Sequence, residues 1–282
     1  MTDNPKAVVV GYGYAGRSFH SYLINITPTL DLYGVVSSSA EKRERIEEER
    51  GCRTFATFEE AIAQEAVDLI VLATPNHVHA PLAIRAMDAG KHVVTEKPMC
   101  LDAEEADAML AAARANDRLL SVFQNRRWDG GYLTVHKLMD EGRLGDVRWI
   151  ETAWQGGFGP HGGWRGQAEK GGGGLFDLGA HMIDQILQMF PAAVTSVYCR
   201  MHHDFEDSNV ESEALTVLTF ADGRTAVVDT SRLAAIKKPR WYVRGTGGTF
   251  RKYGMDPQEG AMNREEINAA VEPEENYGLL SD

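Results

Sequence analysis

The stretch AVVVGYGYAG, residues 7–16, decides the fold, because it joins a short apolar strand to a glycine-rich turn. Residues 7–10 are small or β-branched and apolar, which is typical of a strand buried in a parallel sheet. An amphipathic segment at residues 19–26 follows and stops before Pro28, so a helix is expected after the turn. A strand, a glycine-rich turn and a helix in this order predict the start of a dinucleotide-binding fold.

The glycines of this turn have the spacing G-x-G-x-x-G, at Gly11, Gly13 and Gly16. Gly11 permits the tight turn, Gly13 lets the backbone approach a pyrophosphate, and Gly16 lets the helix pack closely on the strand. Tyr14 and Ala15 then lie at the helix N-terminus, where backbone N–H groups face the phosphates. An ordinary glycine-rich connection between a strand and a helix is the alternative.

Outward from this stretch, strand patterns and helix patterns alternate as far as residue 120. Such alternation predicts a doubly wound parallel sheet of the α/β class, with ligands bound at the carboxyl ends of the strands. We therefore predict a dinucleotide-binding Rossmann domain over residues 1–120. The expected strands are residues 30–36, 68–73, 92–95 and 119–123, and the expected helices are residues 41–50, 58–64, 79–89 and 103–115.

The end of the second expected strand indicates which dinucleotide is bound. Ser37, Ser38 and Ser39 occupy the place where an NAD-preferring site usually carries an acidic residue. Hydroxyl groups beside Arg43 or Lys42 suit a 2′-phosphate, because a phosphate needs donors and positive charge whereas a carboxylate would repel it. The sequence therefore favours NADP over NAD as the cofactor. A serine-rich stretch that only caps the following charged helix is the alternative.

Two further motifs lie at strand ends in the same half of the chain. Thr74-Pro75-Asn76 follows the strand at residues 68–73, and Glu96-Lys97-Pro98 follows the strand at residues 92–95. A lysine at that position points its ammonium into the ligand cleft, where it could orient a substrate hydroxyl and stabilise an alkoxide. A lysine that merely lies on the surface is the alternative.

The pattern changes after residue 120, and residues 121–282 are predicted to form a substrate-binding and oligomerisation domain of the α+β class. A glycine-rich loop at residues 156–173 is expected to be a binding or lid segment. Strand patterns separated by turn signals predict an open, mainly antiparallel sheet, with helices on one face and water or another subunit on the other. The expected helix is residues 132–141, and the expected strands are residues 147–155, 194–203, 211–220, 225–233 and 240–244.

Four consecutive glycines, residues 171–174, precede another expected helix. Asp177 and His181 are four residues apart, so both project from one face of that helix, with Asp184 in support. A carboxylate beside an imidazole can hold and move a proton near neutral pH. We interpret the glycine run as a flexible approach that lets the helix face Lys97 across the cleft. A solvated polar stripe on an amphipathic helix is the alternative.

The composition restricts the class of partner. The chain has 282 residues and a formal net charge of −12, which disfavours binding to nucleic acid or to an anionic membrane surface and favours a small molecule. Cys52, Cys100 and Cys199 have neither paired nor metal-ligand spacing, and no signal segment precedes the first strand, so a reducing, cytoplasmic location is expected. The HHD triplet at residues 202–204 lacks a further spaced ligand, so no metal site is predicted.

Together, the glycine fingerprint, the motifs at residues 74–76 and 96–98, and the pattern G-G-G-x-x-D-x-G-x-H-x-x-D at residues 172–184 closely resemble the Gfo/Idh/MocA family of nicotinamide-dependent oxidoreductases. The resemblance covers essentially the whole chain. It implies a catalytic trio of Lys97, Asp177 and His181, a cis peptide bond before Pro98, and a homo-oligomer, dimer or tetramer, formed through the C-terminal sheet. The segment QNRRW at residues 124–128, together with the three serines, resembles the branch that contains NADP-dependent scyllo-inositol dehydrogenases.

The resemblance implies a dehydrogenase that oxidises a secondary alcohol of a sugar or cyclic polyol reversibly. Lys97 and Asp177 would position the substrate, and His181 would take the hydroxyl proton while hydride moves to the nicotinamide. A cofactor-binding regulatory sensor, a glycosidase that uses NAD transiently and a non-enzymatic binding module are rival functions on the same scaffold. The residues expected to bind cofactor are Gly11, Gly13, Tyr14, Ala15, Gly16, Ser37, Ser38, Ser39, Arg43, Thr74, Pro75, Asn76, His79, Glu96, Lys97, Trp164 and Arg165, and those expected to bind substrate are Lys97, Asn125, Arg127, Asp177 and His181.

The C-terminal end departs from the family pattern. After Gly260 the chain is polar and acidic and stops at Asp282, whereas members of the family usually continue with helices that return to the nucleotide domain. We expect either a truncated chain or the absence of those closing helices.

Overall fold

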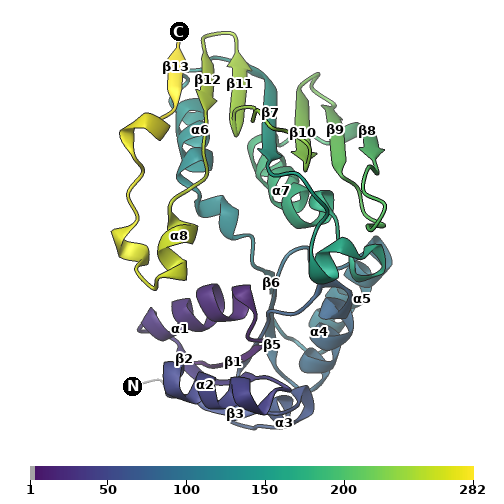
Figure 1. The fold of residues 1–282 in the computed structure, drawn as a ribbon, viewed down its shortest axis with the longest axis vertical. Coiled ribbons are helices and arrows are strands. Elements are labelled where there is room, and N and C mark those ends of the chain that lie inside the picture. The colour runs from purple at the N-terminus through teal and green to yellow at the C-terminus, as the bar shows by residue number, and fades with distance from the viewer. Residues whose placement is uncertain (1–3) are drawn as a thin grey trace. The chain divides into compact units, whose positions relative to one another are not determined.

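The computed structural model describes residues 4–282 and divides into two compact units (Figure 1). The first unit contains the chain up to Phe123 together with Glu259–Ala269, and the second contains Gln124–Gln258 and Ala270–Asp282. The boundary lies at residue 123 rather than at the predicted residue 120. Residues 259–269 cluster with the first unit, although the sequence assigned them to the second domain.

The first unit is built on a six-stranded sheet with the order β3-β2-β1-β4-β5-β6, in which every neighbouring pair is parallel. This confirms the predicted doubly wound α/β class. No sequence pattern predicts β3, because three residues are too few to show an alternation. The strands are β1 (Lys6–Val10), β2 (Asp31–Val36), β3 (Arg53–Phe55), β4 (Leu69–Leu72), β5 (His92–Thr95) and β6 (Leu120–Val122).

Alternate residues of β1 pack on opposite faces of this sheet. Val8 and Val10 belong to one buried cluster, which also contains Met87 of α4, whereas Ala7 and Val9 belong to another that contains Ile46 of α2. Both faces are therefore covered, which explains why β1 is continuously apolar rather than alternating. The helical elements are η1 (Gly16–Ser21), α1 (Tyr22–Ile26), α2 (Ala40–Arg50), α3 (Phe58–Ile62), η2 (Asn76–Val78), α4 (His79–Asp88) and α5 (Ala103–Ala115).

Residues 259–269 of the C-terminal segment return to the first unit. The short helix α8 (Gln258–Asn263) brings Met262 into a buried cluster with Phe19 and Tyr22. The N–H of Ile267, in η7 (Ile267–Ala269), donates to the hydroxyl of Tyr22 at 3.1 Å. A short helix therefore packs on the helix that follows the glycine turn.

The second unit is built on a seven-stranded sheet with the order β13-β12-β11-β7-β10-β9-β8. β7 and β10 are parallel, and the other neighbouring pairs are antiparallel, as the prediction of a mainly antiparallel sheet requires. The strands are β7 (Val147–Gln155), β8 (Val194–His202), β9 (Glu213–Phe220), β10 (Thr225–Ser231), β11 (Trp241–Gly245), β12 (Thr249–Lys252) and β13 (Leu279–Ser281).

Two helices bury the apolar side chains of this sheet. Val135 of α6 (Gly130–Asp140) and Met182 of α7 (Ala180–Met189) share one core cluster with Ile150 of β7 and Val228 of β10. The remaining elements are the turns η3 (Asn125–Trp128), η4 (Gly163–Gly166), η5 (Ala168–Lys170), η6 (Leu175–Gly179) and η8 (Glu274–Asn276). Within residues 4–282, no helix has the length and apolar character needed to cross a membrane.

Candidate active site

The three fingerprint glycines occupy three different surroundings in the first unit. Gly11 has φ of +99°, and a Cβ there would lie 2.5 Å from the carbonyl oxygen of Ala73; a Cβ on Gly16 would lie 2.0 Å from that of Gly11. Both sites exclude any side chain. A Cβ on Gly13, in contrast, would meet no atom within 4 Å. The open backbone of Gly13 fits the approach of a pyrophosphate, so this turn can hold a dinucleotide.

Tyr14 and Ala15 follow this open position at the start of the helix. The N–H of Arg17 donates to the carbonyl of Gly13 at 2.9 Å, so the helix begins at the turn and directs its N-terminus there. The Tyr14 hydroxyl donates to Glu259 at 2.8 Å and accepts from the side-chain amide of Asn263 at 2.8 Å. The returning segment therefore fixes the tyrosine of the fingerprint.

The serines after β2 cap the following helix and adjoin an arginine. Ser39 caps α2, because its hydroxyl accepts from the N–H of Lys42 at 3.3 Å. Arg43 donates from Nη1 to the carbonyl of Ser37 at 2.8 Å, which holds a guanidinium at the end of β2, and Ser38 beside it is exposed. A guanidinium next to an exposed hydroxyl suits a 2′-phosphate.

The motifs after β4 and β5 are tied to each other by His79, the first residue of α4. Its Nδ1 lies 2.9 Å from the carbonyl oxygen of Pro98, and its Nε2 lies 2.9 Å from that of Thr74. The peptide bond between Lys97 and Pro98 is cis, as the resemblance implied. Asn76, at the start of η2, is also buried, and His79 joins the loops that carry the two motifs.

Glu96 has a partner that sequence reasoning missed. Its carboxylate Oε1 lies 2.8 Å from Nε2 of His20, and both side chains are buried. Burial raises the pKa of Glu96, but the bond with His20 and the charges of His20 and Lys97 outweigh it, so the pKa lies below its usual value. The available signal was a histidine within the amphipathic segment at residues 19–26, since a buried polar group needs a partner.

In the second unit, the structure brings together the carboxylate and the loop residues singled out from the sequence. Asp177 lies in the π-helical turn η6, and its Oδ2 accepts from Nε of Arg165 at 3.2 Å. The guanidinium of Arg165 lies 4.5 Å from the centre of the Trp164 ring. Arg165 therefore contacts both the carboxylate of Asp177 and the ring of Trp164.

His181, one turn further along, is held by a neutral partner. It is 4% exposed, and its Nδ1 donates to Oε1 of Gln124 at 3.1 Å. The ring of Trp154 lies nearly parallel to the imidazole, with centroids 6.5 Å apart. An amide oxygen accepts a hydrogen bond only from a nitrogen that carries a proton. Gln124 therefore keeps the proton of the neutral ring on Nδ1 and the lone pair on Nε2. Sequence reasoning missed Gln124 and Trp154.

Asp184 lies one turn beyond His181 and forms an ion pair with Arg127. Nε and Nη2 of Arg127 donate to the two carboxylate oxygens at 2.7 and 2.5 Å. Gln185 donates to the backbone carbonyl of Arg126 at 2.5 Å, and Asn125 is partly buried at the start of the same turn, η3. Residues 124–127 are therefore fastened to α7 along its polar side.

The glycine run at residues 171–174 is closely packed, which corrects its interpretation as a flexible approach. All four glycines are buried. A Cβ on Gly172 would lie 2.4 Å from the carbonyl oxygen of Arg165, and one on Gly173, where φ is +103°, would lie 2.3 Å from Oε2 of Glu211. These glycines let the loop that carries Arg165 pack against the start of η6.

The residues predicted for catalysis belong to both units. Lys97 follows β5 in the first unit, whereas Asp177 and His181 lie on η6 and α7 in the second. The second unit also contains the predicted residues Asn125, Arg127, Trp164 and Arg165. The first unit contains all the other residues predicted to bind cofactor.

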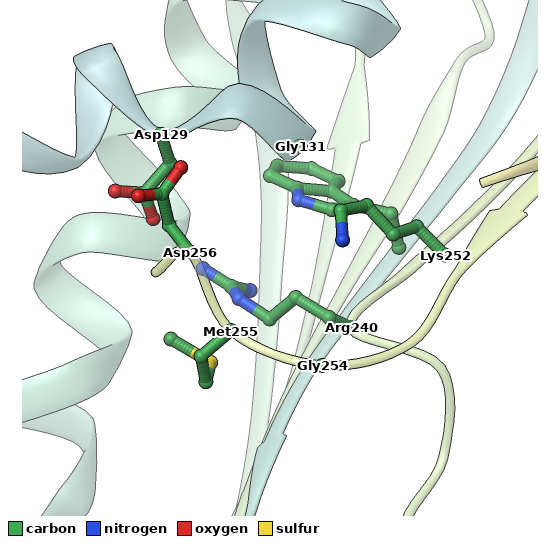
Figure 2. A pocket seen from close by; sticks show the side chains of 8 residues that line it. Asp129, Gly131, Arg240, Lys252, Gly254, Met255 and Asp256 are labelled. Atoms are coloured by element: carbon green, nitrogen blue, oxygen red, sulfur yellow. The ribbon is translucent and has the colours of Figure 1, made fainter. Parts of the chain in front are cut away.

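Figure 2 shows a cavity of the second unit that contains none of the predicted site residues. The carboxyl groups of Asp129 and Asp256 lie beside each other at one end, and the guanidinium of Arg240 extends toward them (Figure 2). Burial is the main cause that raises the pKa of Asp129 to about 6, and the charge of Asp256 adds to it. Burial also lowers the pKa of Arg240 to about 10. The cavity is lined by Asp129, Gly131, Arg240, Trp241, Lys252, Gly254, Met255 and Asp256.

Two family models match the chain. Residues 6–124 match the oxidoreductase family with an NAD-binding Rossmann fold, and residues 132–251 match the GFO/IDH/MocA C-terminal domain. The chain belongs to the Gfo/Idh/MocA family of oxidoreductases. It is therefore an NAD(P)-binding oxidoreductase, as the resemblance implied.

Relatives within this family include proteins similar along the whole chain. The uncharacterized oxidoreductase YdgJ of Escherichia coli is 35% identical over 99% of this chain and 78% of its own length. The scyllo-inositol 2-dehydrogenase (NADP⁺) IolW of Bacillus subtilis is 32% identical, with the same coverage. The crystal structure of a putative oxidoreductase from Klebsiella pneumoniae is similar with a TM-score of 0.86 and 34% identity, over 100% of this chain and 78% of that one.

Proposed function

We propose that this member of the family is an NADP-dependent dehydrogenase that oxidises a secondary alcohol of a sugar or cyclic polyol, in a reversible reaction. The observation that carries the proposal is the hydrogen bond between His181 and Gln124, with Asp177 one turn away. It provides a buried imidazole whose Nε2 can accept a proton. The name of the relative IolW, a scyllo-inositol 2-dehydrogenase that uses NADP⁺, supports an inositol-like substrate.

The reaction removes a hydride from the carbinol carbon and a proton from its hydroxyl. Bound NADP⁺ would supply the acceptor of the two electrons that leave with the hydride. His181 accepts the hydroxyl proton at Nε2, while the bond from Nδ1 to Gln124 keeps the ring in the orientation and tautomer that this transfer needs. In the reverse direction the imidazolium returns the proton to the alkoxide oxygen.

Lys97 and Asp177 position the substrate in this proposal. The ammonium of Lys97 stabilises negative charge on the oxygen as its proton leaves, and the carboxylate of Asp177 accepts a hydrogen bond from the alcohol. Arg165 orients that carboxylate through its bond at 3.2 Å. Lys97 is then the oxyanion stabiliser, Asp177 the hydrogen-bond acceptor and His181 the base. The glycine turn holds the cofactor.

The cofactor assignment rests on the end of β2. Arg43 lies against Ser37, and no carboxylate of residues 37–39 competes with a 2′-phosphate there. Replacing Arg43 by Ala should weaken NADPH binding about tenfold and leave NADH binding unchanged. Arg45, an exposed arginine of the same helix that pairs with Glu49, is the matched control. Equal losses for the two cofactors, measured by fluorescence titration, would reject the NADP preference.

The substrate assignment is tested by screening NADP⁺ reduction over inositols and aldoses. Turnover of at least one of them by the wild-type protein, lost on His181→Ala with NADPH binding retained, is the expected result. Bound cofactor without net reduction would favour a glycosidase that uses NAD transiently, and cofactor binding without any turnover would favour a regulatory sensor.

We further propose that the chain is a homo-oligomer that associates through the sheet of the second unit. β8 is exposed along most of its length and carries Val197, Tyr198 and Met201 at 64%, 56% and 43% exposure, with Leu215 of β9 nearby in the sheet. Val197 and Met201 point to one face of the sheet, and Tyr198 and Leu215 to the other, so apolar side chains are exposed on both faces of this edge. Exposed apolar surface of this kind commonly marks an interface. Light scattering should give the mass of a dimer or tetramer, and Tyr198→Asp should lower it; a monomeric wild-type protein would reject the proposal.

A further inference from the structure

The two chain neighbours of Lys97 are each in contact with a buried histidine. His20, in the helix after the glycine fingerprint, reaches the side chain of Glu96, and His79, at the start of α4, reaches the backbone carbonyl of Pro98. His20 is 4% exposed and His79 is fully buried. Two titratable side chains on two different helices therefore converge on one three-residue segment.

On the side of Glu96, both carboxylate oxygens are engaged. Oε1 lies 2.8 Å from Nε2 of His20, and Oε2 accepts from the backbone N–H of Lys97 at 3.2 Å. The carboxylate therefore connects η1 to the backbone of Lys97 itself. Removing the imidazole would leave a buried carboxylate with the Lys97 N–H as the single partner among the described hydrogen bonds, and such a group relaxes or takes up a proton.

The imidazole of His20 is itself fixed by packing. Its ring lies 4.4 Å from the ring of Phe123, centroid to centroid, and the N–H of Phe123 donates to the carbonyl of Thr95 at 2.8 Å. The backbone of η1 is a π-helical turn, a form that often occurs at functional sites. A ring held by this packing can hold the carboxylate of Glu96 in a fixed position.

On the side of Pro98, the contact depends on Nδ1 of His79. That nitrogen lies 2.9 Å from the Pro98 carbonyl, while Nε2 lies 2.9 Å from the Thr74 carbonyl at the end of β4. A carbonyl oxygen only accepts, and a neutral imidazole carries one proton, so the neutral ring donates to one of these carbonyls while its other nitrogen lies against the second. Burial lowers the pKa of His79 and so disfavours a ring that carries both protons. The ring thereby spans the loops that follow two adjacent strands, β4 and β5.

We propose that His20 and His79 are positioning residues that hold the Glu96-Lys97-Pro98 segment from both sides and so direct the ammonium of Lys97 at the reacting oxygen. This rests on the proposed function, in which Lys97 acts on the substrate. Lysine has a flexible four-carbon stem, so its ammonium is directed only as well as its backbone is held. A misplacement of about 1 Å in an active site can slow a reaction about a hundredfold.

The first pair of variants tests His20. His20→Leu removes the donor, whereas His20→Gln places an amide nitrogen three bonds from Cβ, as Nε2 is in histidine. We expect His20→Leu to lower kcat for an accepted alcohol at least tenfold with the Kd for NADPH changed less than threefold, and His20→Gln to recover most of kcat. His136→Leu, at an exposed histidine of α6, is the control and should match the wild-type protein.

The second pair separates the two nitrogens of His79. Asparagine carries its amide nitrogen two bonds from Cβ, as Nδ1 is, and glutamine three bonds, as Nε2 is. His79→Asn should therefore keep the bond to Pro98 and most of kcat, while His79→Gln should keep only the bond to Thr74 and lose kcat. Equal kcat values for the two folded variants would contradict a role of His79 through Pro98.

A measurement without turnover separates this inference from the proposed function. Reductive methylation with ¹³C-formaldehyde labels lysine ammonium groups, and the NMR signal of Lys97 is assigned by its loss in Lys97→Arg. We expect this signal to shift in His20→Leu and not in His136→Leu. If His20→Leu does not fold, Glu96→Gln, which keeps the shape and removes the charge, replaces it.

An unshifted Lys97 signal in the folded His20→Leu or Glu96→Gln protein would overturn the positioning role, whatever the turnover. Full turnover of Lys97→Ala would instead overturn the proposed role of Lys97 in catalysis, and a shifted signal would still support the contact. The two failures are therefore distinguishable.

Discussion

His20 and His181 are buried to the same extent, 4% exposed each, and both belong to helices that contain a π-helical turn, but their partners differ. His20 in the first unit faces the carboxylate of Glu96 at 2.8 Å, whereas His181 in the second faces the neutral amide of Gln124 at 3.1 Å. The carboxylate of Glu96 also accepts from the backbone N–H of Lys97 at 3.2 Å, so His20 holds a loop, whereas Gln124 fixes which ring nitrogen of His181 carries the proton. Two equally buried histidines therefore have different roles because their partners differ.

Two buried carboxyl groups repeat this contrast. Burial raises the pKa of Glu96, but His20 and Lys97 lower it by a larger amount. The pKa of Glu96 is therefore below its usual value, and the group is ionised in the folded protein. Asp129 has Arg126 at 3.5 Å, yet burial and the neighbouring Asp256 leave its pKa at about 6. A strong local hydrogen bond therefore decides the charge of Glu96, whereas desolvation decides that of Asp129.

Among variants at residues other than His181, the largest expected effect follows from removing the charge of Lys97. Lys97→Met keeps the length of the side chain and removes the ammonium, so kcat should fall about 10²–10³-fold, the range for loss of an oxyanion-stabilising group. NADPH affinity should change less than threefold. Lys137→Met, at an exposed lysine of α6, is the control. If both variants turned over alcohol equally, the charge of Lys97 would have no part in the reaction.

A smaller effect is expected when His181 is given the kind of partner that His20 has. Gln124→Glu places a carboxylate beside Nδ1, which stabilises the imidazolium. As the pH falls, His181 should therefore become protonated at a higher pH than in the wild-type protein. In the direction of alcohol oxidation, the acidic limb of the kcat/KM profile should move up by about one pH unit. Gln188→Glu, on the exposed end of the same helix, is the control. An unmoved acidic limb would show that His181 does not set it.

The smallest effect on turnover is expected at Asp129, where the change is in stability. Its pKa in the folded protein, about 6, lies above the unfolded value of 3.8, so its contribution to stability is complete below pH 3.8 and is lost as the pH rises through 6. From pH 4.5 to pH 7, the free energy of unfolding of the wild-type protein should fall by about 2 kcal/mol relative to that of Asp129→Asn. Urea unfolding at the two pH values measures it; parallel changes would place the pKa of Asp129 near its ordinary value.

Local patterns in the sequence predicted the first unit well, because a parallel sheet buried on both faces has continuous apolar strands and its ligand motifs follow those strands directly. The returning helix α8 was not predicted, since its contact is one methionine, Met262, in a polar segment. The parallel pairing of β7 with β10 also has no local signal, because register depends on residues far apart in the chain.

The partners of the candidate site residues were the main omission. His20 and Glu96 are 76 residues apart, and Gln124 and His181 are 57 apart, so no spacing rule connects them. The glycines at residues 171–174 were interpreted from their backbone freedom, whereas their packing against Arg165 and Glu211 depends on the tertiary fold. Residue types and strand ends predicted which side chains to consider, and the fold decided what each of them contacts.

The central claim, that His181 takes the proton of the alcohol, is tested most directly by a single turnover of enzyme loaded with NADP⁺ and mixed with an accepted polyol. Stopped-flow absorbance of NADPH at saturating substrate gives the rate of hydride transfer. We predict that His181→Ala slows this rate about 10²–10⁴-fold, the range for general base catalysis, with NADPH affinity unchanged. A rate equal to that of the wild-type protein would contradict the account.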